Sequence, residues 1–320
     1  MNLSPLITLN YEGVKNALLR NTTLIHISVV VASLFIIPAH TKIYYNQIMR
    51  INKYIASCTS LSRRKAEELI STGKIRVNDK IVRDLSAQIQ SSDKVYLSSS
   101  VIPARQRSGK HPAGIQKTKG EFILLTPQEF VYYALNKPVG YTTTTADPHA
   151  EKLITDLVPK DPPVFPVGRL DKDTSGLIFL TNDGDFAQKM THPKYEKEKE
   201  YIVETDKPLS EKSLVKLRTG IKLDDGTTAP AKVTPLCHSL EGGNPVKRES
   251  SQKKLHKEFN CLNKPNCYSI TIHEGRNRQI RRMINAAGAK VMKLKRIRIG
   301  NFDLGDLKEG KYKNFDKIEQ

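Results

Sequence analysis

Residues 168–186 read GRLDKDTSGLIFLTNDGDF and place four aspartates close together in a strongly basic chain. Asp171 and Asp173 lie between Gly168 and Gly176, and glycine permits sharp backbone turns that other residues adopt only with strain. The apolar run LIFLT follows directly, and a short run of this kind is typical of a buried strand. The stretch therefore predicts a tight loop that holds a short carboxylate at the mouth of a sheet.

Two other kinds of site use closely spaced aspartates, and this loop fits neither. An EF-hand calcium loop shares the acidic spacing, but it ends in a bidentate glutamate where this chain has Asn182, and no pair of helices flanks the loop. A phosphate-accepting aspartate of the D-x-D-x-T kind needs its threonine one position later than Thr174, and the preceding FPVGRL is not a uniform apolar strand. The remaining interpretation is a lone catalytic aspartate in a tight loop, with Arg169 beside it.

The whole chain carries an excess of positive charge, with 52 Lys and Arg against 33 Asp and Glu in 320 residues. The net charge of +19 makes a polyanion the first partner to consider, and nucleic acid fits better than a membrane surface because no strong basic amphipathic helix stands out. A hydrophobic fraction of 38% is enough for a folded core. The four cysteines include no C-x-x-C pair, so we expect no disulfide framework and a reducing compartment.

Residues 1–48 differ from the rest of the chain. Residues 23–39 read TLIHISVVVASLFIIPA, an apolar run shorter than the roughly 20 residues that a spanning helix needs. The run is similar to the core of a signal peptide, although the stretch before it is long and poor in charge. Met49 is followed directly by RINKYIA, which is typical of the start of a folded domain. We therefore expect residues 1–48 to be an upstream-start artefact or a targeting extension, and we expect no membrane partner.

Residues 49–97 predict a compact module of two helices and a hairpin. Apolar residues repeat at helical spacing from Ile51, and Ser62 is a favourable N-cap for the helix RRKAEELI, which ends at Gly73. KIRVNDKIV alternates apolar and polar residues around Asn78, which predicts a β-hairpin, and residues 93–97 predict another strand.

These segments resemble the S4 RNA-binding domain, and the resemblance implies that basic residues of the module contact RNA. A solvated charged face is the alternative interpretation of the same residues. The residues expected to contact RNA are Arg50, Lys53, Arg63, Arg64, Lys65, Lys74 and Arg76.

Residues 98–128 predict a linker, because residues 98–120 are rich in Ser, Gly, Pro and positive charge. Such a tether raises the effective concentration of a second RNA-contacting unit. Residues 129–320 then interleave strands and helices in irregular order, which predicts an α+β domain with a mainly antiparallel sheet. Residues 239–266 interrupt that domain with a polar stretch that we expect to be a long loop insertion, with RNA contact as a lesser alternative.

Four motifs follow one another from residue 131 onward: LNKPVGY, GRLDKDTSGLIFLTNDGDF, HPKYEKEKEYIV and EGRNRQIRRM. In their order and spacing the chain resembles the RNA pseudouridine synthases, in the branch that carries an N-terminal S4 domain and acts on ribosomal RNA. The resemblance implies isomerisation of a uridine to pseudouridine, without a cofactor or a metal, in a central cleft of the catalytic domain. We expect large-subunit RNA as the substrate and a monomer that works in the cytoplasm, or in an organelle if residues 1–48 are a targeting segment.

The resemblance also assigns roles to single residues. Asp171 matches the essential aspartate, which either attacks covalently or removes a ribose proton. Tyr201, in EKEY, matches the aromatic residue that lies against the target base. Arg281, in RQIR, matches the basic residue that pairs with the aspartate, and Ile280 matches an apolar contact to the base. The further substrate contacts that we expect are Arg169 and Arg276.

The other three aspartates of the opening stretch are expected to be structural. Asp173 is placed to brace the loop that holds Asp171. Asp183 and Asp185 stand at the start of the predicted helix DFAQKMTH, where carboxylates are favoured by the helix dipole.

Residues 276–298 hold nine positive residues and no acidic one, which predicts a surface that follows phosphates. A catalytically idle S4-type RNA-binding or ribosome-assembly protein is the alternative function. The complete set of Asp171, Tyr201 and Arg281 argues against it. The nine positive residues are Arg276, Arg278, Arg281, Arg282, Lys290, Lys293, Lys295, Arg296 and Arg298.

Overall fold

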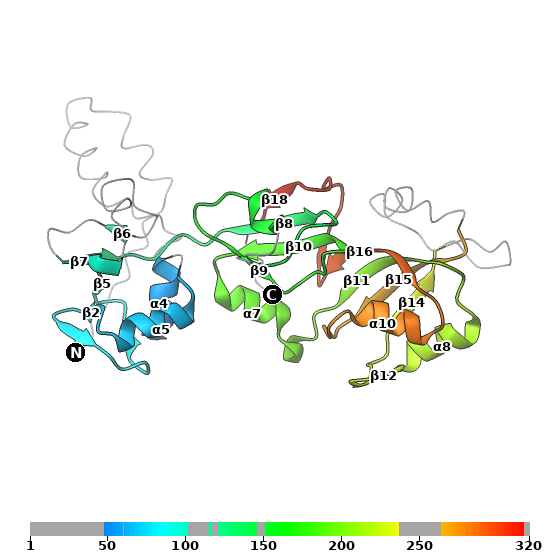
Figure 1. Ribbon diagram of the computed structural model, residues 1–320, viewed down its shortest axis with the longest axis horizontal. Coiled ribbons are helices and arrows are strands. Elements are labelled where there is room, and N and C mark those ends of the chain that lie inside the picture. Colours follow the sequence, from blue (N-terminus) through cyan, green and yellow to red (C-terminus); the bar gives the residue numbers. More distant parts are fainter. Residues whose placement is uncertain are drawn as a thin grey trace, which may run out of the picture.

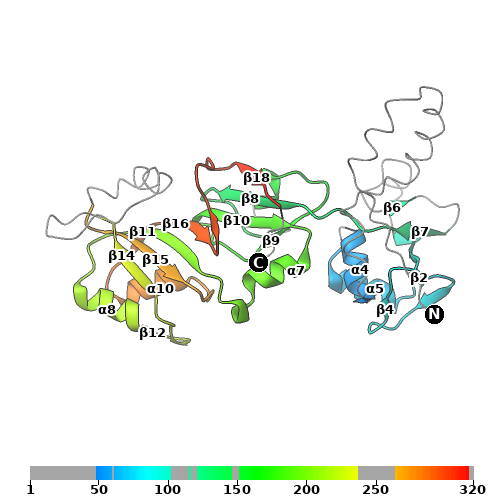
Figure 2. The ribbon, with the colours of Figure 1, turned by 180° about the vertical axis from the view of Figure 1, so that it is seen from behind.

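The computed structural model describes residues 48–59, 61–101, 115–116, 121–145, 151–236 and 264–316. The predicted extension over 1–48, apart from Ile48, and the predicted insertion over 239–266, apart from its last three residues, lie outside these ranges. Figure 1 shows a small module, coloured blue to cyan, at one end of an elongated molecule, and a longer domain that forms the rest. The view from behind in Figure 2 shows the same division.

The N-terminal module packs two helices against a small antiparallel sheet. Ser62 caps the second helix, because its hydroxyl accepts a hydrogen bond from the amide of Lys65. Asn78 adopts the left-handed conformation (φ 52°) in the two-residue turn of the hairpin. The predicted helix cap and hairpin are therefore confirmed. The elements are β1 (Met49–Arg50), α4 (Ile51–Cys58), α5 (Arg63–Ser71), β2 (Ile75–Val77), β3 (Lys80–Val82), β4 (Gln88–Ile89), β5 (Val95–Ser98) and the 3-10 helix η1 (Ser99–Val101).

The second half of the predicted linker belongs to this module. β7 (Phe122–Leu125) pairs with β5, and β6 (Ile115–Gln116) pairs with β7, so the sheet has the order β3-β2-β5-β7-β6. Ile123 and Leu125 are buried in the core of the module. The polar and basic composition of residues 98–120 concealed the short apolar strand that follows it. The sheet of the module therefore runs to Leu125 rather than ending at residue 97.

The longer domain is built on one nine-stranded sheet of main order β14-β15-β11-β16-β10-β8-β18, with β9 beside β10 and β17 beside β16. The strands are β8 (Tyr132–Lys137), β9 (Phe165–Val167), β10 (Ser175–Thr181), β11 (Lys199–Thr205), β14 (Lys232–Pro235), β15 (Cys267–Ile272), β16 (Val291–Ile299), β17 (Phe302–Asp303) and β18 (Tyr312–Asn314). Its described strands pair antiparallel, except for β10 with β16. The predicted α+β class and mainly antiparallel sheet are confirmed.

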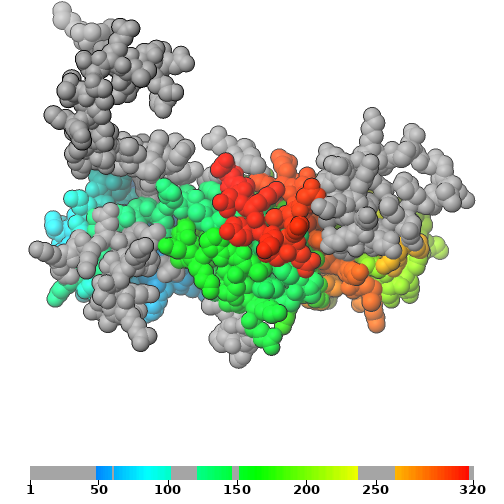
Figure 3. Space-filling model, turned by 90° about the horizontal axis from the view of Figure 1, so that it is seen from above, coloured from blue at the N-terminus to red at the C-terminus, as the bar shows by residue number. Residues whose placement is uncertain are grey.

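Short helices and a separate hairpin connect these strands. The C-terminal segment, red in Figure 3, returns over the green part of the domain, because β18 pairs with β8. The connecting elements are η2 (Ile154–Leu157), α7 (Gly184–Thr191), η3 (Pro193–Tyr195), α8 (Glu211–Thr219), the hairpin strands β12 (Lys222–Leu223) and β13 (Gly226–Thr227), and α10 (Gln279–Ala286). None of the helices in the described part of the chain is long and apolar enough to cross a membrane.

The parallel pairing of β10 with β16 is a narrow seam between the two halves of the sheet. It has two residue pairs, Ser175 with Lys295 and Gly176 with Arg296. Side chains alternate along β10, so that Ile178 belongs to the hydrophobic core on one face of the sheet and Phe179 to the core on the other. Both cores also include residues from the second half of the sheet, so packing on both faces holds the seam closed.

An ion pair joins the N-terminal module to the longer domain. Lys53, on α4, donates to both carboxylate oxygens of Asp185 at 2.8 and 2.7 Å. Asp185 lies in the first turn of α7, and Asp183 caps that helix by accepting from the amides of Asp185 and Phe186. The predicted helix-start roles of both aspartates are confirmed. Lys53, predicted to contact RNA, is held by the protein itself.

Replacement of Gly176 by alanine is expected to open the seam. Gly176 has φ +108°, and a Cβ there would lie 2.2 Å from the carbonyl oxygen of Arg296. Gly288 is a matched control, since it has φ +90° with no atom within 4 Å of the same Cβ position. We expect Gly288→Ala to lower the free energy of unfolding by about 1–2 kcal/mol, the cost of left-handed backbone. Gly176→Ala should lose more than about 4 kcal/mol in urea denaturation. Equal losses of stability in the two variants would contradict the close contact between Gly176 and the backbone of Arg296.

Candidate active site

The loop that carries Asp171 joins β9 to β10, and its backbone is fixed from below by a buried lysine. Lys137, the last residue of β8, is fully buried, and its Nζ atom donates to the carbonyl oxygens of Pro138 (3.0 Å), Asp171 (3.0 Å) and Thr174 (2.7 Å). The hydroxyl of Thr143 donates to the carbonyl of Leu170 at 2.6 Å. With its carbonyls held in this way, the loop presents the partly exposed Asp171 side chain to a cavity.

Lys137 had no individual role in the interpretation of the sequence, although it stands in the motif LNKPVGY. Burial lowers the pKa of Lys137 from 10.5 to about 8, against the opposing charges of Asp173 and Asp171. A lysine at the end of an otherwise apolar strand was the signal for it, because a buried ammonium needs several acceptors. The acceptors are carbonyls of a distant loop, which the sequence did not pair with it.

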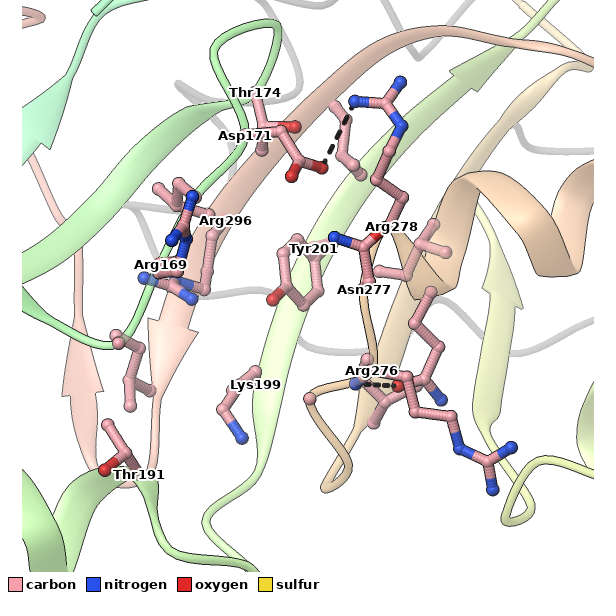
Figure 4. A pocket seen from close by; sticks show the side chains of 18 of the residues that line it. Arg169, Asp171, Thr174, Thr191, Lys199, Tyr201, Arg276, Asn277, Arg278 and Arg296 are labelled. Carbon is pink, nitrogen blue, oxygen red and sulfur yellow. Dashed lines mark hydrogen bonds and ion pairs between the residues drawn. The ribbon is translucent and has the colours of Figure 1, made fainter. Parts of the chain in front are cut away.

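The cavity has a volume of about 560 Å³ and is closed on one side by Tyr201 and Ile280. Figure 4 shows Tyr201 in the middle of the cavity wall, with the Asp171 loop above it and Asn277 and Arg278 on one side. Tyr201 projects from β11 and Ile280 from α10, and both are largely buried. Asp171, Tyr201, Ile280, Arg281, Arg169 and Arg276, which the sequence predicted as site residues, all line this one cavity.

The arginine that pairs with Asp171 is Arg278 rather than Arg281. The Nη1 atom of Arg278 lies 3.6 Å from the Asp171 carboxylate. The same Arg278 guanidinium donates to both carboxylate oxygens of Asp173, at 3.2 and 3.0 Å. Arg281 forms an ion pair with Asp173 (3.3 Å) and donates to the carbonyl of Asp173 at 2.8 Å. The expected pairing of Arg281 with Asp171 is therefore corrected. The two arginines stand three residues apart in one motif, and the sequence could not tell which of them reaches the carboxylate.

The position of each arginine relative to α10 explains why Arg278, and not Arg281, reaches Asp171. Arg278 precedes α10 with a left-handed backbone (φ 46°), which turns its half-exposed side chain toward the cavity mouth. Arg281 lies within α10, and its side chain is 14% exposed. Burial tends to raise the pKa of Asp173, but the hydrogen bond from Arg278 and the charges of Arg281 and Arg278 outweigh it and lower that pKa. Asp173 braces the loop, as predicted.

Arg276 and Arg282 are held by the β12–β13 hairpin. Arg276 donates to the carbonyls of Gly226 (3.2 Å) and Thr227 (2.8 Å). Arg282 forms ion pairs with Asp224 at 3.3 Å and with Asp225. The predicted RNA contact of Arg282 therefore meets a side chain that is already paired within the protein. Arg276 still lines the cavity.

The basic run over residues 276–298 does not form one free surface. Lys295 and Arg296 point into the protein from β16 and are buried. Arg298 pairs with Glu200 at 2.9 Å, and Lys293 pairs with Glu204 at 3.5 Å. These glutamates stand on β11, which runs antiparallel beside β16, so acidic residues distant in sequence neutralise the run. The local sequence contains no acidic residue, so it could not show this pairing. Phosphate contact by the residues of the run that stay exposed remains a prediction.

The basic residues predicted in the N-terminal module fall into two groups. Lys65 pairs with Glu68 at 2.6 Å, and the Arg76 guanidinium stacks on Tyr96 at 4.4 Å from the ring centre. Lys74 is partly buried. Arg50, Arg63 and Arg64 are exposed to solvent, and Lys65 is exposed as well as paired.

The described part of the chain holds no group of three or more His, Cys, Asp or Glu side chains that could bind a metal ion. The cavity brings a carboxylate, an aromatic ring and several guanidinium groups together. A ribosomal large subunit pseudouridine synthase B of Bacillus subtilis is 37% identical over 262 residues, which cover 82% of this chain and 89% of the relative. The family model described as RNA pseudouridylate synthase matches residues 131–286. The chain belongs to the RNA pseudouridylate synthase family.

Further comparisons agree on both parts of this synthase. The S4 domain model matches residues 49–95. The dual-specificity RNA pseudouridine synthase RluF of Escherichia coli K12 is 32% identical over 271 residues, which cover 85% of this chain and 77% of the relative. A chloroplastic relative from Arabidopsis thaliana, SVR1, is 31% identical over 291 residues, with 86% and 60% covered.

The different contacts of Arg278 and Arg281 predict that one substitution mainly lowers turnover and the other mainly lowers stability. Arg278→Gln removes a half-exposed charge beside Asp171, so we expect turnover to fall at least tenfold. It also breaks the partly exposed ion pair with Asp173, which should lower the free energy of unfolding by no more than about 1 kcal/mol. Arg281→Gln removes a mostly buried side chain that braces the loop, so we expect a lower free energy of unfolding. Pseudouridine formation and urea denaturation are measured for both variants. A stable but inactive Arg281→Gln beside a fully active Arg278→Gln would restore the original pairing.

Replacement of Lys137 by methionine is expected to change how stability depends on pH. The pKa of Lys137 is lower in the folded chain than in the unfolded chain, so the folded state binds fewer protons between about pH 8 and 10.5. The free energy of unfolding therefore rises with pH across that window, and Lys137→Met lacks this part of the rise. The measurement is urea denaturation of both proteins at pH 8, 9 and 10. A difference between them that stays constant with pH would contradict the prediction.

Proposed function

We propose that this synthase isomerises a uridine of ribosomal RNA to pseudouridine, with Asp171 as the residue that carries the reaction. The supporting observation is the arrangement of Asp171, Tyr201 and Arg278 around one cavity. Its volume of about 560 Å³ suits a ligand of the size of one nucleotide. Ribosomal RNA is the proposed partner because the relatives from Bacillus subtilis and Arabidopsis thaliana carry names that refer to the ribosomal large subunit.

The reaction breaks the bond between C1′ and N1 of uridine, turns the base, and joins C5 to C1′. The proton on C5 leaves and a proton is gained at N1, so the product has the atoms of the substrate. A carboxylate serves either route to this result, by attack on the nucleoside or by removal of a ribose proton. Both need an ionised Asp171, and the guanidinium of Arg278 at 3.6 Å stabilises that negative charge.

The base must leave its stack before it can enter the cavity, at a cost of a few kcal/mol. The ring of Tyr201 forms a wall on which a uracil can stack, and Ile280 offers an apolar contact beside it. The S4 module then adds affinity through sequence-independent contacts to phosphates, for which Arg50, Arg63 and Arg64 are exposed. In this proposal the longer domain carries out the reaction, and the N-terminal module contributes to RNA binding.

Large-subunit RNA is the favoured substrate, because the relatives from Bacillus subtilis and Arabidopsis thaliana are named as ribosomal large subunit pseudouridine synthases, the second as a putative one. The protein acts as a monomer, in the compartment where its ribosomes are assembled. That compartment is the cytoplasm, or an organelle if residues 1–48 are a targeting segment.

The test begins with pseudouridine mapping of ribosomal RNA from cells with and without the gene. Purified variants are then assayed on an unmodified RNA fragment that contains the mapped uridine. Asp171→Asn keeps the size of the side chain and removes its charge, so turnover should vanish while RNA binding survives. Asp173→Asn is the matched control two residues away. It weakens two partly exposed ion pairs, with Arg278 and Arg281, each worth about 0.2–1 kcal/mol, but the amide oxygen still accepts hydrogen bonds, so most of the turnover should be retained. Substantial turnover by Asp171→Asn would refute the proposed role, and full binding without any modified uridine would favour the idle RNA-binding protein.

A further inference from the structure

Arg296 is a buried arginine that lines the cavity and lacks a carboxylate partner among the described residues. It is 4% exposed, and its Nε atom donates to the carbonyl of Leu177 at 2.7 Å. Its Nη2 atom is buried with no hydrogen-bond partner in the described part of the chain. A guanidinium carries five N–H donors, so most of its hydrogen-bonding capacity is unused.

Burial of an unpaired charge is unfavourable, because the charge loses water without gaining an opposite charge. Packing does not require an arginine on this strand, since the seam is held by backbone pairing and by the apolar cores on both faces. A positive group kept at such a position therefore indicates that an anion joins it in the functional complex.

The surroundings of Arg296 strengthen this conclusion, because they are positively charged. Burial, and after it the charge of Arg296, lowers the pKa of Lys199 from 10.5 to about 8. Lys199 uses its donors on the carbonyls of Lys197, His273 and Glu274, so it contributes charge but no free hydrogen bond. Figure 4 shows Arg169 and Arg296 on the same side of Tyr201, away from Arg278. Asp171 is the one acidic residue among the described residues that line the cavity.

We infer that Arg296 and the exposed Arg169 form a subsite for a phosphodiester group that flanks the target uridine. The inference rests on the proposed function and names the part of the substrate that this side of the cavity holds. A diester suits the subsite better than a uracil carbonyl, because it carries a full negative charge into a positively charged pocket. Arg296 is then a positioning residue: it fixes the backbone of the flipped nucleotide while Asp171 acts at the other side of the base.

The test replaces single phosphates by neutral methylphosphonates. The substrate is the ribosomal RNA fragment that carries the mapped uridine, made with a methylphosphonate on the 5′ side or the 3′ side of that uridine. We expect one of the two to lower kcat/KM of the wild-type protein about 10- to 100-fold, the range for a hydrogen bond to a charged group. The same RNA should cause little further loss in Arg296→Gln, because the interaction is already absent.

A matched control and a second readout make the result decisive. Arg298→Gln changes an arginine on the same strand that is paired with Glu200, so this variant should respond to the methylphosphonates as the wild type does. Binding of the same RNAs to Asp171→Asn, and to Asp171→Asn combined with Arg296→Gln, gives the affinity without turnover. If Arg296→Gln does not fold, the wild-type and Asp171→Asn measurements still show whether either phosphate matters.

Each outcome has one meaning. Loss at one phosphate that disappears with Arg296 supports the subsite. Full turnover of both methylphosphonate substrates by the wild-type protein overturns it, as does an equal loss with and without Arg296. Failure of the wild-type protein to modify the unaltered RNA overturns the proposed function itself, and the subsite with it.

Discussion

The close approach of β10 to β16 is the constraint on which the rest of the structure depends. Two parallel residue pairs join the halves of the sheet, and a side chain at Gly176 would collide with the backbone of Arg296. The contact sets the Asp171 loop, which leads into β10, opposite Tyr201 on β11. A wider spacing would separate the carboxylate from the aromatic wall and leave no cavity of nucleotide size.

Buried cations organise the site around this seam. Lys137 and Lys199 each bind three carbonyl oxygens, one group beneath the Asp171 loop and the other beside the segment that leads to Arg278. Backbone carbonyls thereby accept hydrogen bonds from the buried ammonium groups, and the loops that carry these carbonyls are held in place. The carboxylates of Asp171 and Asp173 form their ion pairs with arginines. A preorganised arrangement of this kind stabilises charge during a reaction without further movement.

The net positive charge of the chain gives a poor guide to where RNA is contacted. Arg282 and Arg298 are paired with acidic residues from other segments, and Lys53 is paired across the two domains. The exposed positive groups of the N-terminal module and the unpaired Arg296 in the cavity are a small part of the total. Long-range attraction of RNA still follows the net charge, whereas specific contact depends on the few groups left without a partner.

The sequence by itself determined the fold class, the cap at Ser62, the hairpin at Asn78 and the motif residues Asp171 and Tyr201, because each depends on local spacing or on a contiguous motif. It did not determine the strand that extends the S4 sheet to Leu125, the pairing of Arg278 with Asp171, or the role of Lys137. Those contacts join segments that are far apart in the chain or choose between neighbours on one helix. Local residue patterns carry no information about such distances, so only the tertiary structure decided them.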